Sequence, residues 1–233
     1  MTEPAMNLQH QGIARQLSLV PTHILDEHIT IVGAGAVGSW VALGLAKSGF
    51  KNLAIFDHDE VDIVNMSCQF YGVKDIGKKK VEALAERILE MTGESIMDIP
   101  EKWNGMKMSG IVVMAADSME ARKQIFEAHV GNHHTKLLID ARMGAETALI
   151  YTVNPNDEQS CKAYSGSLHS DAEGVQERCS AKSTTYCAIT LSGLIIKCVR
   201  DALMPGKLIK SLAFSLKEND WICFSNDLRP QPK

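Results

Sequence analysis

The residues best suited to chemistry begin with three glycines, Gly33, Gly35 and Gly38, in the pattern G-x-G-x-x-G. An apolar run at 29–32 precedes them and the helically spaced segment SWVALGLAKSGF follows, which is the strand–turn–helix setting that this motif requires. The first glycine permits the tight turn, the second lets backbone N–H groups approach a phosphate, and the third lets the helix pack on the strand. The sequence therefore predicts a nucleotide site, although the glycines alone do not distinguish NAD, FAD and ATP.

Charged side chains at the ends of the following elements favour ATP among these nucleotides. Asp57 ends an apolar run 19 residues after Gly38, where a carboxylate can bond the ribose of NAD or of ATP. Further charged groups follow: Asp59, the lysines at 78–80, and Asp117 at the end of the run GIVVMAAD. A dehydrogenase has little use for lysines and additional carboxylates here, whereas a triphosphate with Mg²⁺ requires both. We therefore expect ATP and Mg²⁺ as cofactors.

Alternating strand and helix patterns must position these groups. Strands are predicted at 29–32, 52–57, 95–99, 110–117, 136–144 and 147–155, and helices at 39–50, 78–93, 118–133 and 184–204. Two alternating apolar runs within 211–225 predict a closing hairpin. The expected fold class is α/β: a Rossmann-like, doubly wound, mostly parallel sheet with a C-terminal antiparallel hairpin, which binds ligands at the carboxyl ends of its strands.

Composition limits the function classes. With 233 residues, 45% of them hydrophobic, the chain can form one domain, and its net charge of −4 gives no reason to expect nucleic acid or a membrane as partner. No signal peptide or membrane span is evident, so we expect a cytoplasmic protein. The six cysteines form no C-x-x-C pair, so no structural zinc is expected.

In their order along the chain, the motifs resemble those of the ThiF/MoeB/HesA family, bacterial relatives of ubiquitin-activating enzymes, over roughly residues 11–203. The matching motifs are Arg15-Gln16, the glycine loop, Asp57-His-Asp59 with Asn65, Asp75-Ile-Gly77-Lys-Lys-Lys80, and Asp117 with Arg122. The resemblance implies a single ThiF-like adenylation domain over 1–233, with an N-terminal segment at 1–28 and a crossover or active-site loop at 155–183. It implies an ATP-dependent adenylyltransferase that activates a carboxylate, typically the C-terminal glycine of a ubiquitin-like or sulfur-carrier protein.

The resemblance also assigns roles to individual residues. Asp57 would hold the ribose, Asn65 and Lys80 would hold phosphates and stabilise charge in the transition state, and Asp117 would ligate Mg²⁺. Arg15 matches an arginine finger that reaches the ATP of a neighbouring subunit, which implies a homodimer. Two more residues are expected to face the nucleotide, Asp59 and Gln69.

Each of these residues also has a structural alternative. The lysines at 78–80 could be solvent-exposed side chains at the start of a helix, and Asp59 could have no role beyond capping a turn. Asp117 could be a helix N-cap, where a carboxylate is favourable without a metal. Arg15 is by default a surface arginine.

The chain departs from the family at Cys68, which stands where the family has an arginine three residues after the asparagine. One phosphate-facing cation is therefore missing. Either Lys78 or Lys79 compensates for it, or the chemistry is weakened or altered.

A second cysteine, Cys179, occupies the position of the family's transfer cysteine, in a loop just ahead of a helix. It lies between Arg178 and Lys182, and neighbouring cations lower a thiol pKa. An idle loop cysteine is the alternative, and Cys161 is the second candidate nucleophile.

The function expected from the sequence is ATP-dependent adenylation of a carboxylate, with transfer to Cys179 as a candidate second step. One alternative is an NAD- or FAD-dependent oxidoreductase that uses the same glycine loop. It is disfavoured because the sequence shows no evident substrate domain. The other is a catalytically weak nucleotide-binding module that presents a carrier protein, which the cysteine at position 68 keeps open.

Overall fold

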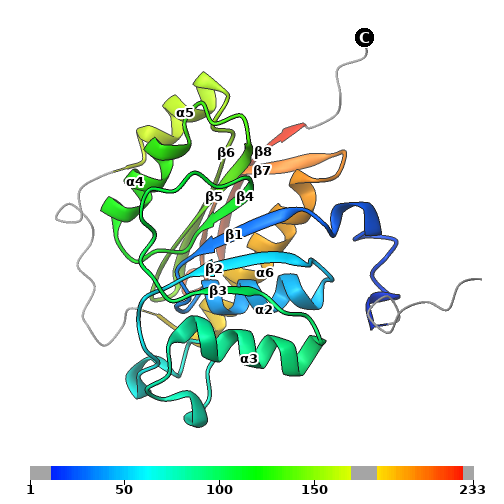
Figure 1. Cartoon of the computed structure of the whole chain (residues 1–233). Helices are drawn as coiled ribbons and strands as arrows, with labels where there is room; N and C mark the ends of the chain where they lie inside the picture. Colours follow the sequence, from blue (N-terminus) through cyan, green and yellow to red (C-terminus); the bar gives the residue numbers. More distant parts are fainter. Residues whose placement is uncertain (1–11, 169–182, 228–233) are drawn as a thin grey trace, which may run out of the picture.

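The computed structural model describes residues 12–168 and 183–227, and its centre is an eight-stranded sheet between two layers of helices (Figure 1). The strand order across the sheet is β3-β2-β1-β4-β5-β6-β7-β8. The strands are β1 (His28–Val32), β2 (Asn52–Phe56), β3 (Met97–Ile99), β4 (Gly110–Met114), β5 (Thr135–Gly144), β6 (Thr147–Val153), β7 (Lys207–Ser215) and β8 (Asp220–Asp227).

The five strands from β3 to β5 are parallel and the remaining three are antiparallel. This arrangement confirms the predicted α/β class with a parallel core and a C-terminal hairpin, β7–β8. The antiparallel part extends further than predicted, because β5 and β6 also form a hairpin. Only Ala145 and Glu146 separate these two strands, and Ala145 adopts a positive φ of 48° in the turn.

Helices cover both faces of the sheet (Figure 1). One layer contains α2 (Gly38–Lys47), α3 (Lys80–Thr92) and α6 (Thr185–Ala202), and the other contains α4 (Met119–His129) and α5 (Glu158–Ser165). Three short 3₁₀ turns complete the described elements: η1 (Thr22–Ile24), η2 (Ile63–Asn65) and η3 (Val73–Asp75). Each face of the sheet has its own hydrophobic core. No helix in the described part of the chain is both long and apolar enough to cross a bilayer.

Helix α5 is an element that the sequence pattern did not predict, because it lies in the polar stretch interpreted as a loop. The Asp157 side chain caps it by accepting a hydrogen bond from the Ser160 N–H at 2.6 Å. Its one buried side chain, Tyr164, anchors it to the core. A short helix with one fully buried side chain leaves no periodic signal, and capping, Tyr164 and the partly buried Cys161 hold it in place.

Candidate functional site

The glycine loop joins β1 to α2, and two of its glycines have no room for a side chain. A Cβ on Gly33, which has φ of 103°, would lie 2.5 Å from the Ala115 carbonyl oxygen. A Cβ on Gly38 would lie 1.8 Å from the Gly33 carbonyl oxygen. At Gly35, by contrast, a Cβ would meet nothing within 4 Å. The loop is therefore tight against its own chain and open above its middle glycine, as a phosphate loop must be.

Asp57 follows β2 and its carboxylate is bonded to the glycine loop. One oxygen accepts the Ala34 N–H at 2.7 Å, and the other accepts the Asp59 N–H at 2.8 Å. Ala34 is also held through its carbonyl oxygen, which accepts a hydrogen bond from the Tyr71 hydroxyl at 2.7 Å. Burial raises the pKa of Tyr71, which keeps this hydroxyl a donor. The predicted ribose-binding residue and the loop are thus one connected unit.

Lys80, the first residue of α3, is buried, with 7% of its side chain exposed. Its ammonium donates a hydrogen bond to Asp59 at 2.8 Å, and Asp59 is itself half exposed. This hydrogen bond lowers the pKa of Asp59. The solvated-helix alternative is therefore wrong for Lys80, and Asp59 does more than cap a turn.

The turn before α3 determines where Lys80 points. Asp75 is buried there and accepts hydrogen bonds from the Gly72 N–H at 2.8 Å and from Arg87 at 2.5 Å. The Lys80 N–H donates to the Asp59 carbonyl at 3.0 Å. The motif D-x-G-x-x-K therefore combines a structural carboxylate with a buried ammonium.

The other two lysines are directed elsewhere. Lys78 pairs with Glu86 at 2.5 Å, and Lys79 donates to the His58 carbonyl at 3.0 Å. Cys68 is buried, and its sulfur lies 3.0 Å from the Ser183 hydroxyl. These contacts give no support to the hypothesis that Lys78 or Lys79 compensates for the arginine that Cys68 replaces.

The segment around Cys68 is fastened to the start of α2. Trp40 donates to the Cys68 carbonyl at 2.9 Å, and the Phe70 N–H donates to the Ser39 hydroxyl at 3.0 Å. In this segment the amide oxygen of Gln69 is buried and has no hydrogen-bond partner among the described residues. Because buried polar atoms normally have partners, this oxygen marks a place where a ligand donor fits. Asn65, at the end of η2, is partly exposed.

Asp117 lies in the turn 115–118 between β4 and α4 and is exposed. The N-cap of α4 is Ser118, whose hydroxyl accepts the Ala121 N–H at 3.2 Å, so the N-cap alternative for Asp117 is wrong. Within the described residues the Asp117 carboxylate has no hydrogen bond or ion pair. The turn meets β1 through the Ala115 N–H, which donates to the Val32 carbonyl at 2.8 Å.

The residues fit Mg·ATP by the chemistry of their donors. A buried ammonium, an unpartnered amide and the open loop suit phosphates and a nucleoside, and Mg²⁺ prefers carboxylate oxygens. Asp57, His58 and Asp59 bring their ligand atoms within 4.8 Å of one another, but the two carboxylates already accept backbone and Lys80 hydrogen bonds. Asp117 is therefore the better candidate for the metal ligand.

Arg15 is exposed and lies far from this edge of the sheet. The neighbouring Gln16 donates to the Lys47 carbonyl, at the carboxyl end of α2, at 3.4 Å. The glycine loop is at the other end of that helix, and a helix of 10 residues is about 15 Å long. The structure thus does not bring Arg15 to the glycine loop of its own chain.

Of the cysteines, Cys179 lies outside the described residues. Burial raises the pKa of Cys161, whose sulfur lies 3.6 Å from the Asn154 and Pro155 carbonyls, so its thiolate fraction is small. The structure gives no support to Cys161 as the nucleophile.

A buried polar cluster in the middle of β5 was not predicted from the sequence. Asp140 is fully buried and bonded to Arg122, Arg142 and Tyr164. The signal available was a D-x-R pair inside an otherwise apolar strand, since a buried charge requires a partner.

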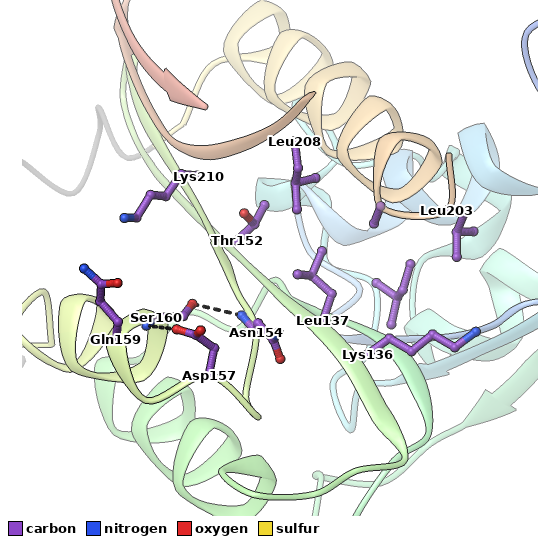
Figure 2. A pocket seen from close by; sticks show the side chains of 12 residues that line it. Lys136, Leu137, Thr152, Asn154, Asp157, Gln159, Ser160, Leu203, Leu208 and Lys210 are labelled. Atoms are coloured by element: carbon purple, nitrogen blue, oxygen red, sulfur yellow. Dashed lines mark hydrogen bonds between the residues drawn. The ribbon is translucent and has the colours of Figure 1, made fainter. Parts of the chain in front are cut away.

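A cavity of about 320 Å³ lies at the opposite edge of the sheet (Figure 2). Leu137 and Leu208 line it near the starts of β5 and β7, and Lys210 and Gln159 stand at its side (Figure 2). It opens at the amino ends of β4 and β5, away from the glycine loop, so it is not the predicted nucleotide site.

These features define a Rossmann-like α/β domain with a glycine-rich loop after its first strand and an antiparallel extension of its sheet. The sequence profile described as the ThiF family matches residues 13–224. The chain therefore belongs to the ThiF family, as the motifs predicted.

Curated relatives match parts of the chain. The NEDD8-activating enzyme E1 catalytic subunit of Arabidopsis thaliana is 34% identical over 104 residues, which cover 42% of this chain and 23% of that protein. The tRNA threonylcarbamoyladenosine dehydratase of Escherichia coli K12 is 40% identical over 70 residues, 30% of this chain and 26% of that protein. The chain thus spans about a quarter of the length of these relatives.

Solved structures resemble nearly the whole fold. PaaA superimposes with a TM-score of 0.73 and 17% identity, covering 99% of this chain and 77% of PaaA. The E. coli dehydratase TcdA in complex with ATP has a TM-score of 0.66 and 20% identity, covering 85% of this chain and 96% of TcdA. At this level of identity the likeness shows the fold.

Proposed function

We propose that this chain is an ATP-dependent adenylyltransferase that activates a carboxylate. The observation that carries the proposal is the connection of Lys80, Asp59 and Asp57 to the glycine loop, with Asp117 at the same edge of the sheet. This edge offers a buried cation, a ribose acceptor and a carboxylate for metal. A hydride-transfer site needs neither the buried cation nor the metal-binding carboxylate.

The proposed reaction joins the carboxylate to AMP. A carboxylate oxygen attacks the α-phosphorus, the bond from that phosphorus to the bridging oxygen of the β-phosphate breaks, and pyrophosphate leaves. Lys80 and Asn65 would bind the phosphates, Asp57 the ribose, and Gln69 the nucleoside side of the site. Asp117 would hold Mg²⁺, which would supply neutralisation of phosphate charge. Positioning and charge compensation then account for catalysis without a general base.

The substrate that fits this proposal best is the C-terminal carboxylate of a ubiquitin-like or sulfur-carrier protein, or of a peptide. The names of the relatives support this class: NEDD8-activating and ubiquitin-like modifier-activating enzymes, and MccB solved together with MccA. After adenylation, the Cys179 thiolate would attack the acyl carbon and release AMP, forming a thioester.

The proposal includes a homodimer in which Arg15 serves the neighbouring subunit. Its position near the carboxyl end of α2, away from its own glycine loop, supports action in trans. Mixing Arg15→Ala with Lys80→Met tests this: if Arg15 acts in trans, each variant alone is inactive and the mixed dimers regain part of the pyrophosphate exchange. If Arg15 is only a surface residue, Arg15→Ala alone keeps the wild-type exchange.

Thermal unfolding with Mg·ATP, ATP plus chelator, NAD or FAD tests the nucleotide. A ligand at about a hundred times its dissociation constant adds roughly 2.7 kcal/mol, which is visible as a shift in melting temperature. Stabilisation by Mg·ATP that is lost in Asp57→Ala and Asp117→Ala supports the proposal. Stabilisation by NAD or FAD instead would move the chain to the oxidoreductases.

Pyrophosphate exchange separates an enzyme from a weak nucleotide-binding module. We expect exchange of labelled pyrophosphate into ATP once a carrier protein or peptide with a free C-terminus is added. The same carrier with an amidated C-terminus serves as the control, because it lacks the attacking carboxylate. Stabilisation by Mg·ATP without exchange for any carrier that binds would identify the module.

A further inference from the structure

A fully buried carboxylate lies beneath the edge of the sheet that carries the proposed site. Asp140 in β5 pairs in register with Met114, the last residue of β4. Three donors share its oxygens: Arg122 bonds Oδ1, while Arg142 at 2.7 Å and Tyr164 at 2.9 Å bond Oδ2. Because each oxygen is satisfied, the carboxylate is held in one orientation.

Arg122 connects this carboxylate to the turn that holds Asp117. The guanidinium nitrogen that bonds Asp140 also donates to the Met114 carbonyl at 3.3 Å, and the other terminal nitrogen donates to the Ala116 carbonyl. Ala116 directly precedes Asp117. One planar guanidinium therefore fixes the peptide that sets the direction of the Asp117 side chain.

Arg142 holds the far oxygen of Asp140 and is itself anchored. Its terminal nitrogens donate to the Ser167 carbonyl at 2.9 Å and hydroxyl at 3.0 Å, and its guanidinium lies 4.9 Å from the centre of the Tyr151 ring. Burial opposes the charge of Arg142, but Asp140 and Tyr164 together more than offset this and raise the arginine pKa. The carboxylate cannot rotate without breaking these contacts.

We propose that Asp140 is a positioning residue for the metal ligand of the adenylation site. Through Arg122 it orients the peptide before Asp117, and so sets the affinity of the site for Mg²⁺ bound with ATP. Asp140 is fully buried and its oxygens are taken by Arg122, Arg142 and Tyr164, so its role in this proposal is exerted through Arg122. This inference rests on the proposed function, and the same experiment tests the two separately.

The first variant is Arg122→Lys, which keeps a cation beside Asp140 but cannot bond Asp140 and the Ala116 carbonyl at once. The measurement is the Mg²⁺ concentration that gives half of the thermal stabilisation at a fixed ATP concentration. We expect this midpoint to rise about tenfold or more, as for other groups that orient metal ligands. Stabilisation by ATP with chelator is expected to stay unchanged.

A matched control is Arg200→Lys. Arg200 likewise joins a buried carboxylate, Asp201 at 2.9 Å, to a backbone carbonyl, that of Leu19 at 2.8 Å. This pair lies at the end of α6, beside the cavity at the opposite edge of the sheet. The control is expected to lower the melting temperature and to leave the Mg²⁺ midpoint at the wild-type value.

An unchanged midpoint in Arg122→Lys, or an equal rise in Arg200→Lys, would overturn the inference while the proposed function stands. If Arg122→Lys does not fold, Arg142→Lys answers the same question, with a rise expected again and an unchanged midpoint refuting the inference. If the wild-type protein shows no stabilisation by Mg·ATP, the proposed function itself fails.

Discussion

The buried ammonium of Lys80 gives the sharpest prediction, through the substitution Lys80→Met. Methionine keeps the aliphatic path of the side chain and removes the charge. Since Asp59 is 53% exposed, solvent screens the Lys80–Asp59 pair, and its loss should change the free energy of unfolding by at most about 1 kcal/mol. The folded protein is therefore expected to survive the change.

The effect on nucleotide binding should be much larger. A hydrogen bond from a charged donor contributes about 1.5–3 kcal/mol, and a loss of about 2 kcal/mol weakens binding roughly 30-fold. At an ATP concentration about a hundred times the wild-type dissociation constant, ligand stabilisation then falls from about 2.7 to about 0.9 kcal/mol. In a chain of this size, each kcal/mol of stabilisation raises the melting temperature by roughly 2–4 °C. The shift in melting temperature caused by Mg·ATP therefore falls from about 5–11 °C to about 2–4 °C.

The assay is thermal unfolding of both proteins with and without Mg·ATP. Lys78→Met is the matched control, because Lys78 is two residues away and pairs with Glu86 on the surface. It is expected to retain the full shift. The reasoning is refuted if Lys80→Met keeps the wild-type shift, or if Lys78→Met loses as much of it.

Two further predictions concern the glycine loop and a buried histidine. Gly35→Ala places its Cβ in open space, so the unliganded protein should keep its melting temperature while stabilisation by Mg·ATP is lost. Gly38→Ala places its Cβ 1.8 Å from the Gly33 carbonyl oxygen and should lower the melting temperature of the unliganded protein. Equal melting temperatures for the two unliganded variants would contradict this reasoning. His129 accepts the Met108 N–H at 3.0 Å and donates to a carbonyl with its other nitrogen, and burial lowers its pKa below 6.5. Its contribution to stability is therefore complete above pH 6.5 and is lost as the pH falls below that value, by about 1.4 kcal/mol per pH unit until the folded-state pKa is reached. Urea unfolding at about pH 7.5 and 5.5 should show a larger loss for the wild type than for His129→Gln, and equal losses would refute the assignment.

Much of the fold could be predicted because its signals are local. The parallel strands are short apolar runs, and Ser118 and the glycine loop mark where helices begin. The predicted helix at 78–93 is observed as α3, which buries Val81, Leu84 and Ile88 on one face and leaves Leu89 52% exposed. Helix α5 could not be predicted, since one cap, one buried tyrosine and one partly buried cysteine hold it.

The candidate site divides in the same way. Residue types and order predicted which groups gather at the carboxyl ends of the strands, but not how they are connected. The burial of Lys80 depends on Asp75 fixing the start of α3, and the orientation of the turn at 115–118 depends on Asp140. Asp75 bonds within its own turn and to Arg87, and Arg122 and Asp140 are 18 residues apart. Neither set of side-chain contacts leaves a periodic pattern in the sequence.

The cysteine at position 68 makes the remaining cation more important. In the described part of the chain, Lys80 is the buried cation connected to the glycine loop, because Arg122 and Arg142 share Asp140 and the other two lysines of the cluster pair elsewhere. If a phosphate-facing arginine is absent, charge stabilisation in the transition state depends more heavily on Lys80 and on a cation supplied from outside this subunit. Under the proposed function, the departure from the family pattern and the exposed position of Arg15 both favour the proposed homodimer, in which Arg15 would supply that cation to the neighbouring site.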